Sequence, residues 1–481
     1  MIKEIPEICS DHPFIAVKKL GCHHEVVKIP SIDPEKFMTV LKQEFRKTYW
    51  MECNDIYGNG ESVTIIGAHP IASLSIRDLH SVTTFEKGKQ TRLHFKSNEE
   101  QVQFADKWIK IIQPYAAEQC RYNGLFGYCS YNAVQLSEDI RLASYNNASD
   151  EVPLMQFNLY RYIFVFRKSA GEVLLINNSY GQGTGELARM KRWLFTERTC
   201  QLSSFRVSSE IKTDCTEAEF INKVHQAKKH CLKGDIFQVV LSRKFSRACG
   251  GDPWTFFKAL KETNPSPFMF YMDEDDFQIT GTSPEIHFQA VQGEGCINPI
   301  AGTYKRCGAP EQENESVNRL LNDPKENAEH VMLVDLARND LNRIASKVYV
   351  SQFKTIERYS HVIHIVSRVR GEMPESYGSY RSVMDVFPAG TLSGAPKYRA
   401  MEIIDTLESS SRSFYGGLLG WIGFNGDINT CILIRSALFK NNEMTYRAGA
   451  GIVVSSVPEL ELEEVANKLK AISTSLERFQ E

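Results

Sequence analysis

The pattern of hydrophobic and polar positions changes along the chain. In the N-terminal half, short runs rich in β-branched and aromatic residues predict strands over 62–67, 159–166 and 173–176. Residues 98–112 instead carry apolar side chains near helical spacing, which predicts a helix. This half gathers few groups capable of chemistry, and the polar segment 203–216 is expected to cross to the second half.

The C-terminal half mixes helices with a longer series of strands. Helices are predicted over 217–231, over about 253–263, from 324 towards 346, and from 459 onwards. The predicted strands are 235–242, 268–272, 277–280, 286–289, 416–420, 431–439 and 443–454. Because hairpins follow one another without regular strand–helix alternation, the pattern predicts an α+β architecture.

The helix that begins at Pro324 carries the clearest local signals. Asp323 suits the N-cap, and Pro324 suits the first helical position, where its missing N–H costs no hydrogen bond. The apolar residues of this helix are expected to form one wide buried face. They are Val331, Leu333, Val334, Leu336, Leu341 and Ile344.

Composition narrows the class of protein. A chain of 481 residues is long enough for two domains or one large two-lobed body. The formal charge of −3 argues against a nucleic-acid-binding protein, which usually has a basic excess. No uncharged apolar run reaches the length of a membrane span, and residues 1–6 lack the apolar segment of a signal peptide. We therefore expect a cytoplasmic protein with no membrane association.

The twelve cysteines are scattered and form no Cys-x-x-Cys pair. Cys22, His23 and His24 stand together, but no second ligand pair follows at the spacing of a zinc site. Reduced thiols are the expectation.

Two helices carry pairs of carboxylates. Glu326 and Glu329 are three residues apart, as are Glu461 and Glu464, so each pair lies on one helix face. Two such pairs can hold one hard cation such as Mg²⁺, which prefers oxygen ligands. A solvated helix face explains either pair taken alone, because acidic residues are common near helix N-termini.

Glycine-rich turns and a buried charge suggest an anionic ligand. The turns at 299–303, 389–397 and 448–451 bring backbone N–H groups together, although glycine is also the ordinary residue of tight loops. None matches a phosphate loop or a dinucleotide-binding fingerprint. Arg435 lies in an apolar run and needs a carboxylate partner, from the protein or from a substrate. These residues together predict a soluble, magnesium-dependent enzyme that acts on an anionic small molecule.

Eight motifs, in this order, resemble the chorismate-utilising enzymes, and specifically the large subunits of anthranilate synthases. They occupy residues 234–243, 264–269, 283–285, 299–303, 329–341, 361–364, 393–397 and 449–453. The resemblance implies a two-lobed antiparallel β-sandwich flanked by helices. It divides the chain into an N-terminal regulatory or partner-contacting region at 1–202 and a chorismate-binding catalytic domain at 216–475.

The resemblance also implies roles for single residues. Mg²⁺ would be held by Glu329 and Glu464, with Glu326 and Glu461 nearby. Glu285 matches the general acid that protonates the departing 4-hydroxyl group, and His364 matches a histidine linked to the elimination of pyruvate. The implied substrate-binding residues are Gly302, Thr303, Thr391, Tyr415, Arg435, Gly449, Ala450, Gly451 and Lys468.

Residues at two positions distinguish the chain from relatives that catalyse other reactions of chorismate. Relatives that add water carry a lysine base where this chain has Gln238, so Gln238 favours ammonia as the nucleophile. Relatives that make 4-amino-4-deoxychorismate often carry a nucleophilic lysine where this chain has Ala301. Ala301 favours direct addition of ammonia at C2, and hence anthranilate and pyruvate as products. An aminodeoxychorismate synthase subunit of folate biosynthesis is the alternative. A non-catalytic regulator would be expected to have lost the four glutamates, and all four are present.

The resemblance implies one protein partner and one regulatory ligand. The chain has no Gly-x-Cys-x-Gly element of its own, so a separate glutamine amidotransferase subunit is expected to supply ammonia in a hetero-oligomer. A tryptophan-binding inhibitory pocket is also expected. Its candidate residues are Glu52, Cys53, Pro267, Phe268, Met269, Gly420 and Cys431.

Overall fold

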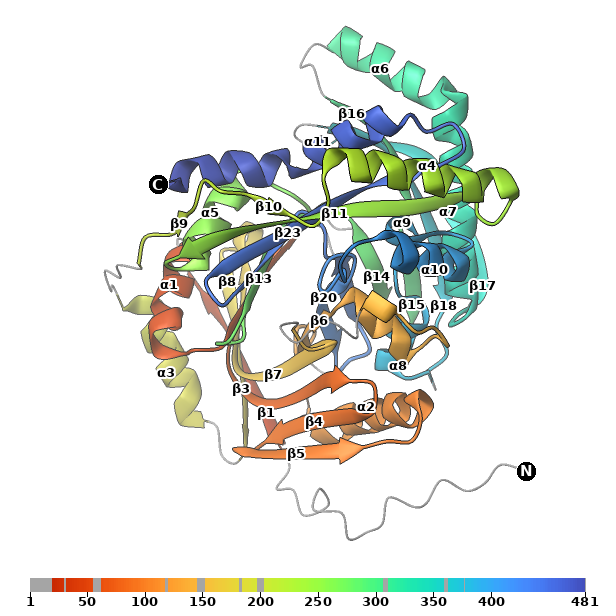
Figure 1. Cartoon of the computed structure of the whole chain (residues 1–481). Helices are drawn as coiled ribbons and strands as arrows, with labels where there is room; N and C mark the ends of the chain where they lie inside the picture. The colour runs from red at the N-terminus through yellow and green to blue at the C-terminus, as the bar shows by residue number, and fades with distance from the viewer. Residues whose placement is uncertain are drawn as a thin grey trace, which may run out of the picture.

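Two curved antiparallel β-layers with helices on their outer faces make up the structure (Figure 1). This computed structural model describes residues 20–29, 32–54, 62–116, 120–144, 152–180, 184–196, 203–305, 310–358, 362–375 and 377–480. His361, the first residue of the motif at 361–364, lies outside the described residues. The layered antiparallel fold that the resemblance implied is confirmed.

The first layer runs from the N-terminal edge strand to the C-terminal strands. Its order is β1 (Leu20–Lys28), β8 (Glu172–Tyr180), β7 (Met155–Arg167), β3 (Ser62–Asp78), β2 (Thr48–Asn54), β12 (Phe268–Asp273), β13 (Gln278–Ser283), β22 (Ser436–Lys440), β23 (Glu443–Ile452) and β11 (Gln238–Gly250). The short strands β9 (Arg206–Val207), β10 (Lys212–Thr213) and β19 (Gly394–Ala395) add to β11.

The second layer shares β3 and β7 with the first. Its order is β5 (Lys89–His94), β4 (Ser81–Glu86), β3, β7, β6 (Gly124–Cys129), β20 (Leu418–Gly423), β21 (Ile428–Ile432), β14 (Ile286–Val291), β15 (Glu294–Ile297) and β18 (Val362–Glu372). Both β16 (Ile300–Lys305) and β17 (Ser346–Arg358) pair with β18.

The strands β3 and β7 pass from one layer to the other. The register of their pairing shifts between Pro70 and Ala72, beside His69 at φ 61°. The first part of β3 pairs with β2 and the last part with β4. Strands from both halves of the sequence therefore lie in both layers, as the pairs β2–β12 and β6–β20 show. The regions predicted at 1–202 and 216–475 share one continuous network of strands.

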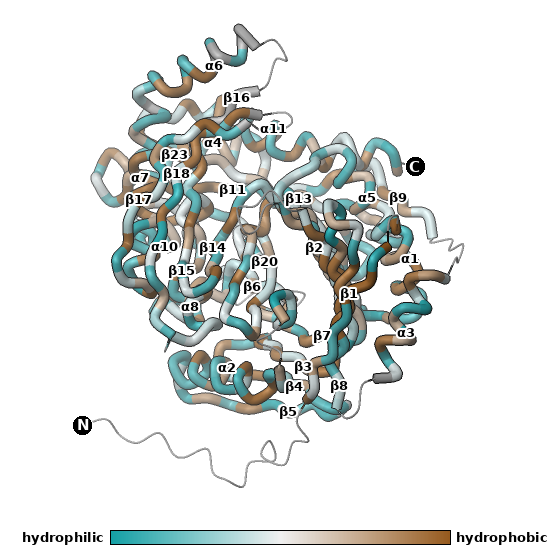
Figure 2. Tube along the Cα trace, turned by 180° about the vertical axis from the view of Figure 1, so that it is seen from behind, coloured by the Kyte–Doolittle hydropathy of each residue, from teal (hydrophilic) through white to brown (hydrophobic). Residues whose placement is uncertain are grey.

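Apolar side chains fill the space between the layers and below the helices. Between the layers lie the fully buried Tyr49, Phe126, Phe270 and Trp421. The most hydrophobic strand segments gather around β2, whereas β5 is largely hydrophilic (Figure 2). The large amount of apolar surface buried on both faces of the sheets is what stabilises this arrangement.

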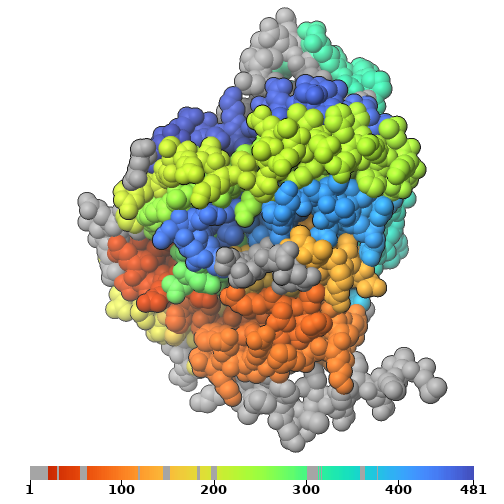
Figure 3. All heavy atoms as spheres, in the orientation of Figure 1, coloured from red at the N-terminus to blue at the C-terminus, as the bar shows by residue number. Residues whose placement is uncertain are grey.

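Helices cover both outer faces. On the first layer lie α1 (Pro34–Glu44), α3 (Thr184–Phe195), α4 (Glu217–Lys233), α5 (Pro253–Thr263) and α11 (Pro458–Leu476). On the second lie α2 (Asn98–Ile112), α7 (Pro324–Asn342) and α8 (Ser379–Asp385). The remaining helices are α6 (Pro310–Asn322), α9 (Gly390–Ser393) and α10 (Lys397–Leu407). The light-green α4 and the blue α11 lie side by side at one end of the molecule (Figure 3).

Local sequence signals explain where the best-predicted helices begin and end. The bounds of α2 and α5 match the predictions at 98–112 and 253–263. The backbone N–H of Glu326 donates to Oδ1 of Asp323 over 3.2 Å, as an N-cap requires. At the C-terminal end of α4, Gly234 adopts φ 79°, a left-handed conformation that favours glycine and stops the helix.

Several details of the prediction are wrong. The strand predicted over 235–242 begins only at Gln238 and continues to Gly250 as β11. The helix α7 ends at Asn342, short of 346, because Ser346 begins β17. Val331 of that helix is 47% exposed and does not belong to its buried face. The strand predicted over 431–439 is two strands, β21 and β22, separated by a connection in which Arg435 adopts φ 49°. No helix of the described residues is long and apolar enough to cross a membrane.

Candidate active site

A cavity of about 250 Å³ lies where the C-terminal edges of the two layers face each other. Its walls come from β11, β23 and α11 on one side and from α7, β18 and the segment before β14 on the other. The charged and polar lining residues are Gln238, Glu285, Glu329, His364, Thr391, Tyr415, Arg435, Arg447, Glu464 and Lys468. Most of the residues predicted for catalysis and binding therefore line one cavity, although they are spread over more than 200 positions of the sequence.

Glu285 is held rigidly at the cavity. Its backbone carbonyl accepts a hydrogen bond of 3.0 Å from the N–H of Ile432 in β21. The hydroxyl of Thr391 donates to its Oε1 over 2.7 Å. Burial raises the pKa of Glu285 to about 7, against the opposing effects of Thr391, Lys468 and Arg435. Near neutral pH a large fraction of this carboxyl group thus carries a proton, which is the form that a general acid needs.

Arg435 and Tyr415 supply groups that can bind a carboxylate. Burial lowers the pKa of Arg435, and the nearby carboxylate of Glu285 opposes that shift. Tyr415 is 3% exposed, and burial raises its pKa to about 12, so it remains a hydroxyl donor. A side chain at Gly449 would place its Cβ 3.1 Å from that hydroxyl and 2.6 Å from the carbonyl oxygen of Leu241. Glycine keeps this wall open.

Two of the four predicted metal ligands face the cavity. Glu329 accepts a hydrogen bond of 3.1 Å from Nε2 of Gln238, and Glu464 pairs with Nζ of Lys468 over 2.7 Å. Glu326 and Glu461 precede them by one helical turn and are not lining residues. Because Mg²⁺ commonly takes one or two carboxylates and keeps waters or substrate oxygens, two glutamates facing one cavity fit its donor preference.

The remaining predicted residues lie around the same space. His364 is 8% exposed in β18, opposite Thr303 of β16 and Glu357 of β17. For Gly302 and Thr303 only the backbone is described, and the register of β16 slips at Gly302. Gly449 and Gly451 line the cavity, whereas Ala450 is fully buried in the core behind it.

A buried ion cluster behind the cavity escaped the sequence analysis. Glu408 accepts hydrogen bonds of 2.7 Å and 3.0 Å from Arg412 and one of 3.0 Å from Arg447. Arg447 also pairs with Asp214 over 3.3 Å and donates to Oγ of Ser242 over 2.9 Å. Since the side chains of Glu408, Arg412 and Arg447 are each 2% exposed, the charges compensate one another away from water. In the sequence, only the four-residue spacing of Glu408 and Arg412 hints at this cluster.

Comparison with known proteins decides the family. The family model described as chorismate binding enzyme matches residues 55–474. The chain belongs to the chorismate binding enzyme family. Anthranilate synthase component 1 of Aquifex aeolicus (strain VF5) is 36% identical over 417 residues, covering 82% of this chain and 83% of that protein. Aminodeoxychorismate synthase component 1 of Bacillus subtilis (strain 168) is 34% identical over 436 residues, covering 88% and 91%.

Solved structures share the fold of this chain. Anthranilate synthase component I from Streptococcus pneumoniae TIGR4 aligns with a TM-score of 0.74 at 28% identity and covers 85% of this chain and 92% of its own. The menaquinone-specific isochorismate synthase of Escherichia coli aligns with a TM-score of 0.71 at 17% identity, covering 95% of both chains, and shows the fold alone. The resemblance stated from the sequence motifs is therefore confirmed.

The residues predicted for tryptophan binding lie on strands of both layers, with Gly420 and Cys431 on the second. Cys53, Phe268 and Cys431 belong to the apolar cluster between the layers. Met269 packs on the opposite, outer face. Glu52 is 7% exposed and pairs with Lys261 of α5 over 2.6 Å.

The pairing of β2 with β12 places Cys53 opposite Phe268 and Glu52 opposite Met269. The N–H of Asn54 donates to the carbonyl of Pro267 over 3.0 Å. Gly420 lies in β20 of the second layer, where Tyr49 reaches its carbonyl over 3.4 Å. Tryptophan binding itself stays a prediction.

Proposed function

We propose that this chain is the chorismate-binding subunit of an anthranilate synthase, which converts chorismate and ammonia into anthranilate and pyruvate in the tryptophan pathway of the cytoplasm. The observation that carries the proposal is the cavity in which Glu285, His364, Arg435, Glu329 and Glu464 meet. Most of the similar relatives bear the name anthranilate synthase component 1, including that of Acetivibrio thermocellus at 38% identity.

The chain's own side chains perform the binding and proton transfer. The guanidinium of Arg435 and the hydroxyl of Tyr415 bind the enolpyruvyl carboxylate beside Gly449. Ammonia adds at C2, the ring double bonds shift, and Glu285 gives its proton to the 4-hydroxyl group, which leaves as water; the new ammonium group then loses a proton to become an amine. His364 then assists the elimination in which C2 loses a proton and the C3–O bond breaks. The departing enolpyruvate takes up a proton at its methylene carbon to become pyruvate. Gln238 holds Glu329 by a hydrogen bond and offers no base that could activate water.

Glu329 and Glu464 are the residues that we propose to hold Mg²⁺, with Glu326 and Glu461 one turn behind. When bound, the ion supplies Lewis-acid polarisation of the substrate carboxylate. Lys468 links the metal-binding side of the cavity to the glycine turn. Its ammonium pairs with Glu464 over 2.7 Å and donates to the carbonyl oxygen of Gly449 over 2.9 Å.

The second candidate is an aminodeoxychorismate synthase subunit, and a specific relative favours it, namely the Bacillus subtilis protein of that name. Ala301 argues against the covalent lysine route to that product. Purified chain with chorismate, ammonium and Mg²⁺ distinguishes the two. The anthranilate reaction gives a fluorescent product without its pyruvyl group, whereas the alternative gives a heavier product that retains it.

We also propose the surface on which the amidotransferase subunit docks. An open apolar groove of about 1040 Å³ is lined by Phe237, Val331, Met332 and Val453, and it includes Glu329, which also lines the catalytic cavity. Phe237 is 72% exposed. Contiguous exposed apolar patches mark interaction surfaces, and ammonia delivered here would enter beside Glu329.

Substitution of Phe237 by serine tests the docking surface. We expect Phe237→Ser to weaken glutamine-dependent activity in the presence of the amidotransferase subunit and to leave ammonium-dependent activity intact. Phe195→Ser is the matched control, because Phe195 is 64% exposed on α3, on the opposite side of the molecule from α7 (Figure 1). Equal loss in both variants, or no loss in either, would remove this surface from the proposal.

A further inference from the structure

The edge strand β1 places two metal-binding side chains on one face. Cys22 and His24 are alternate residues of β1, opposite Asn178 and Ile176 of β8, so their side chains share a face while His23 points to the other. The ring of His23 lies beside Gly21, whose added Cβ would be 3.3 Å from Nε2 of His23.

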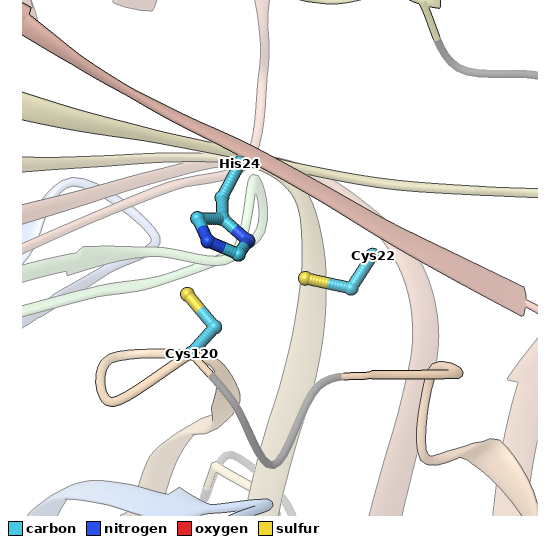
Figure 4. Close-up of side chains that lie close together, drawn as sticks. All are labelled: Cys22, His24 and Cys120. Atoms are coloured by element: carbon cyan, nitrogen blue, oxygen red, sulfur yellow. The ribbon is translucent and has the colours of Figure 1, made fainter.

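The third side chain, Cys120, comes from the segment between α2 and β6. That segment docks on β1 through hydrogen bonds from the N–H of Tyr115 to the carbonyl of Leu20 over 2.7 Å and from the N–H of Cys22 to the carbonyl of Tyr115 over 3.3 Å. The side chains of Cys22, His24 and Cys120 point towards a common centre (Figure 4). Their ligand atoms all lie within 4.8 Å of one another, and no other described residues form such a group of three His, Cys, Asp or Glu.

Asn123 forms hydrogen bonds with both cysteines. Its Nδ2 donates to Sγ of Cys22 over 3.3 Å and to Oδ1 of Asn178 over 2.8 Å, while its N–H donates to the carbonyl of Cys120 over 3.0 Å. Donors of this kind orient metal-binding sulfur atoms in proteins. Cys120 is 2% exposed and His24 is exposed, so the site has a buried base and an open side through which an ion can enter.

We propose that Cys22, His24 and Cys120 bind a zinc ion that joins β1 to the segment preceding β6. Two thiolates and an imidazole are the donor set of zinc, whereas Mg²⁺ prefers oxygen. With Zn–S of about 2.3 Å and Zn–N of about 2.0 Å, tetrahedral ligand atoms lie about 3.5–3.8 Å apart. The three ligand atoms lie within 4.8 Å of one another, so a small inward movement closes the site. Water takes the fourth position. The site is separate from the glutamates of the catalytic cavity, which differ from it in donor type.

This ion would fasten an edge strand. Among the described strands, β1 pairs only with β8, so its other edge is held by the short contact with Tyr115. A zinc ion across that contact cross-links positions 22 and 120, and it stabilises the folded chain because the unfolded chain lacks the preformed site. Sequence spacing could not reveal the site, since the third ligand follows the first by almost one hundred positions.

Metal titration of the full chain tests the proposal. Reduced, chelator-treated protein is titrated with Zn²⁺ and then with Co²⁺, whose thiolate charge-transfer band and tetrahedral d–d bands report sulfur ligation. We expect one tightly bound Zn²⁺ per chain and a rise in Tm on its addition. Cys22→Ser, Cys120→Ser and His24→Gln should each weaken binding at least tenfold and abolish the rise in Tm. His23→Gln, the neighbour on the opposite face, should leave both unchanged.

Three outcomes would overturn the proposal. The first is the absence of a tight zinc equivalent in the unsubstituted chain. The second is zinc binding that persists in His24→Gln and in Cys22→Ser but disappears in the double variant Glu329→Gln/Glu464→Gln. That result would place the zinc at the glutamates of the catalytic cavity. The third is a mass two daltons lower that reducing agent restores, which would show a Cys22–Cys120 disulfide in place of a metal site.

Discussion

The hydroxyl of Thr391 donates a hydrogen bond of 2.7 Å to Oε1 of Glu285, at the wall of the cavity that holds the charged groups of the site. Opposing influences therefore set the proton affinity of Glu285, and Thr391 is the first of those that lower it. Burial raises its pKa to about 7, and the hydrogen bond from Thr391 limits that rise because it stabilises the carboxylate.

The first prediction concerns the pH dependence of the reaction. The protonated form of Glu285 donates the proton, so kcat/KM should fall as the pH rises through about 7. Thr391→Val removes the donor to the carboxylate, which raises the pKa of Glu285 further and moves this alkaline limb to higher pH. Thr391→Ser keeps the hydroxyl and should keep the profile. An alkaline limb that stays in place in Thr391→Val would contradict the role assigned to this contact.

Removal of the proton donor itself has a larger effect. Glu285→Gln should lower kcat/KM by about 10²–10⁴-fold and abolish the limb near neutral pH, because general acid catalysis contributes that much. Steady-state kinetics with ammonium over a range of pH measures both. Activity close to that of the unsubstituted chain would show that another group protonates the leaving hydroxyl.

The metal assignment predicts a paired loss. Glu329→Gln and Glu464→Gln should each abolish turnover at ordinary Mg²⁺ concentrations, because each removes a carboxylate that faces the cavity. Glu463→Gln is the matched control, since Glu463 is an exposed neighbour of Glu464 on α11. A chelator should abolish the activity of the unsubstituted chain. Full activity in Glu329→Gln or Glu464→Gln would show that the assigned ligands are wrong.

The ion cluster behind the cavity predicts a stability effect. Glu408→Gln leaves Arg412 and Arg447 without their shared counter-charge, and removal of one partner from a buried pair costs about 3–5 kcal/mol of the free energy of unfolding. Glu402→Gln breaks the exposed pair with Arg399, which should lower the free energy of unfolding far less because water screens the two charges. Denaturant unfolding of the two variants measures the difference, and similar values would show that the cluster adds little.

Feedback by tryptophan gives a further prediction. If the register of β2 with β12 forms an inhibitory pocket around Glu52, Pro267 and Met269, tryptophan lowers the ammonium-dependent rate. The measurement is initial rate against tryptophan concentration up to the millimolar range. A flat curve removes the regulatory claim and leaves the catalytic one untouched.

Local signals predicted much of the fold, because caps and helical spacing act over a few residues. The bounds of α2 and α5 and the N-cap at Asp323 depend only on their neighbours. The break in the strand predicted at 431–439 could not be foreseen, since a run of apolar residues does not reveal that Arg435 turns the chain towards a cavity built by distant elements.

The residues of the candidate site also divide into those that sequence motifs identify and those that only distant contacts reveal. Motifs identified Glu285 and His364, and the fold brings both to one cavity. Glu408 and Cys120 escaped notice because their importance arises from partners far away in the sequence, Arg447 for the first and Cys22 for the second. Long-range clusters of this kind become visible only when the strands are paired.

The most direct test of the catalytic proposal is the balance of products. Purified chain supplied with chorismate, ammonium and Mg²⁺ should release anthranilate and pyruvate in equal amounts at every time point, without any added lyase. Accumulation of an amino product that keeps its pyruvyl group, with no anthranilate and no pyruvate, would contradict the account.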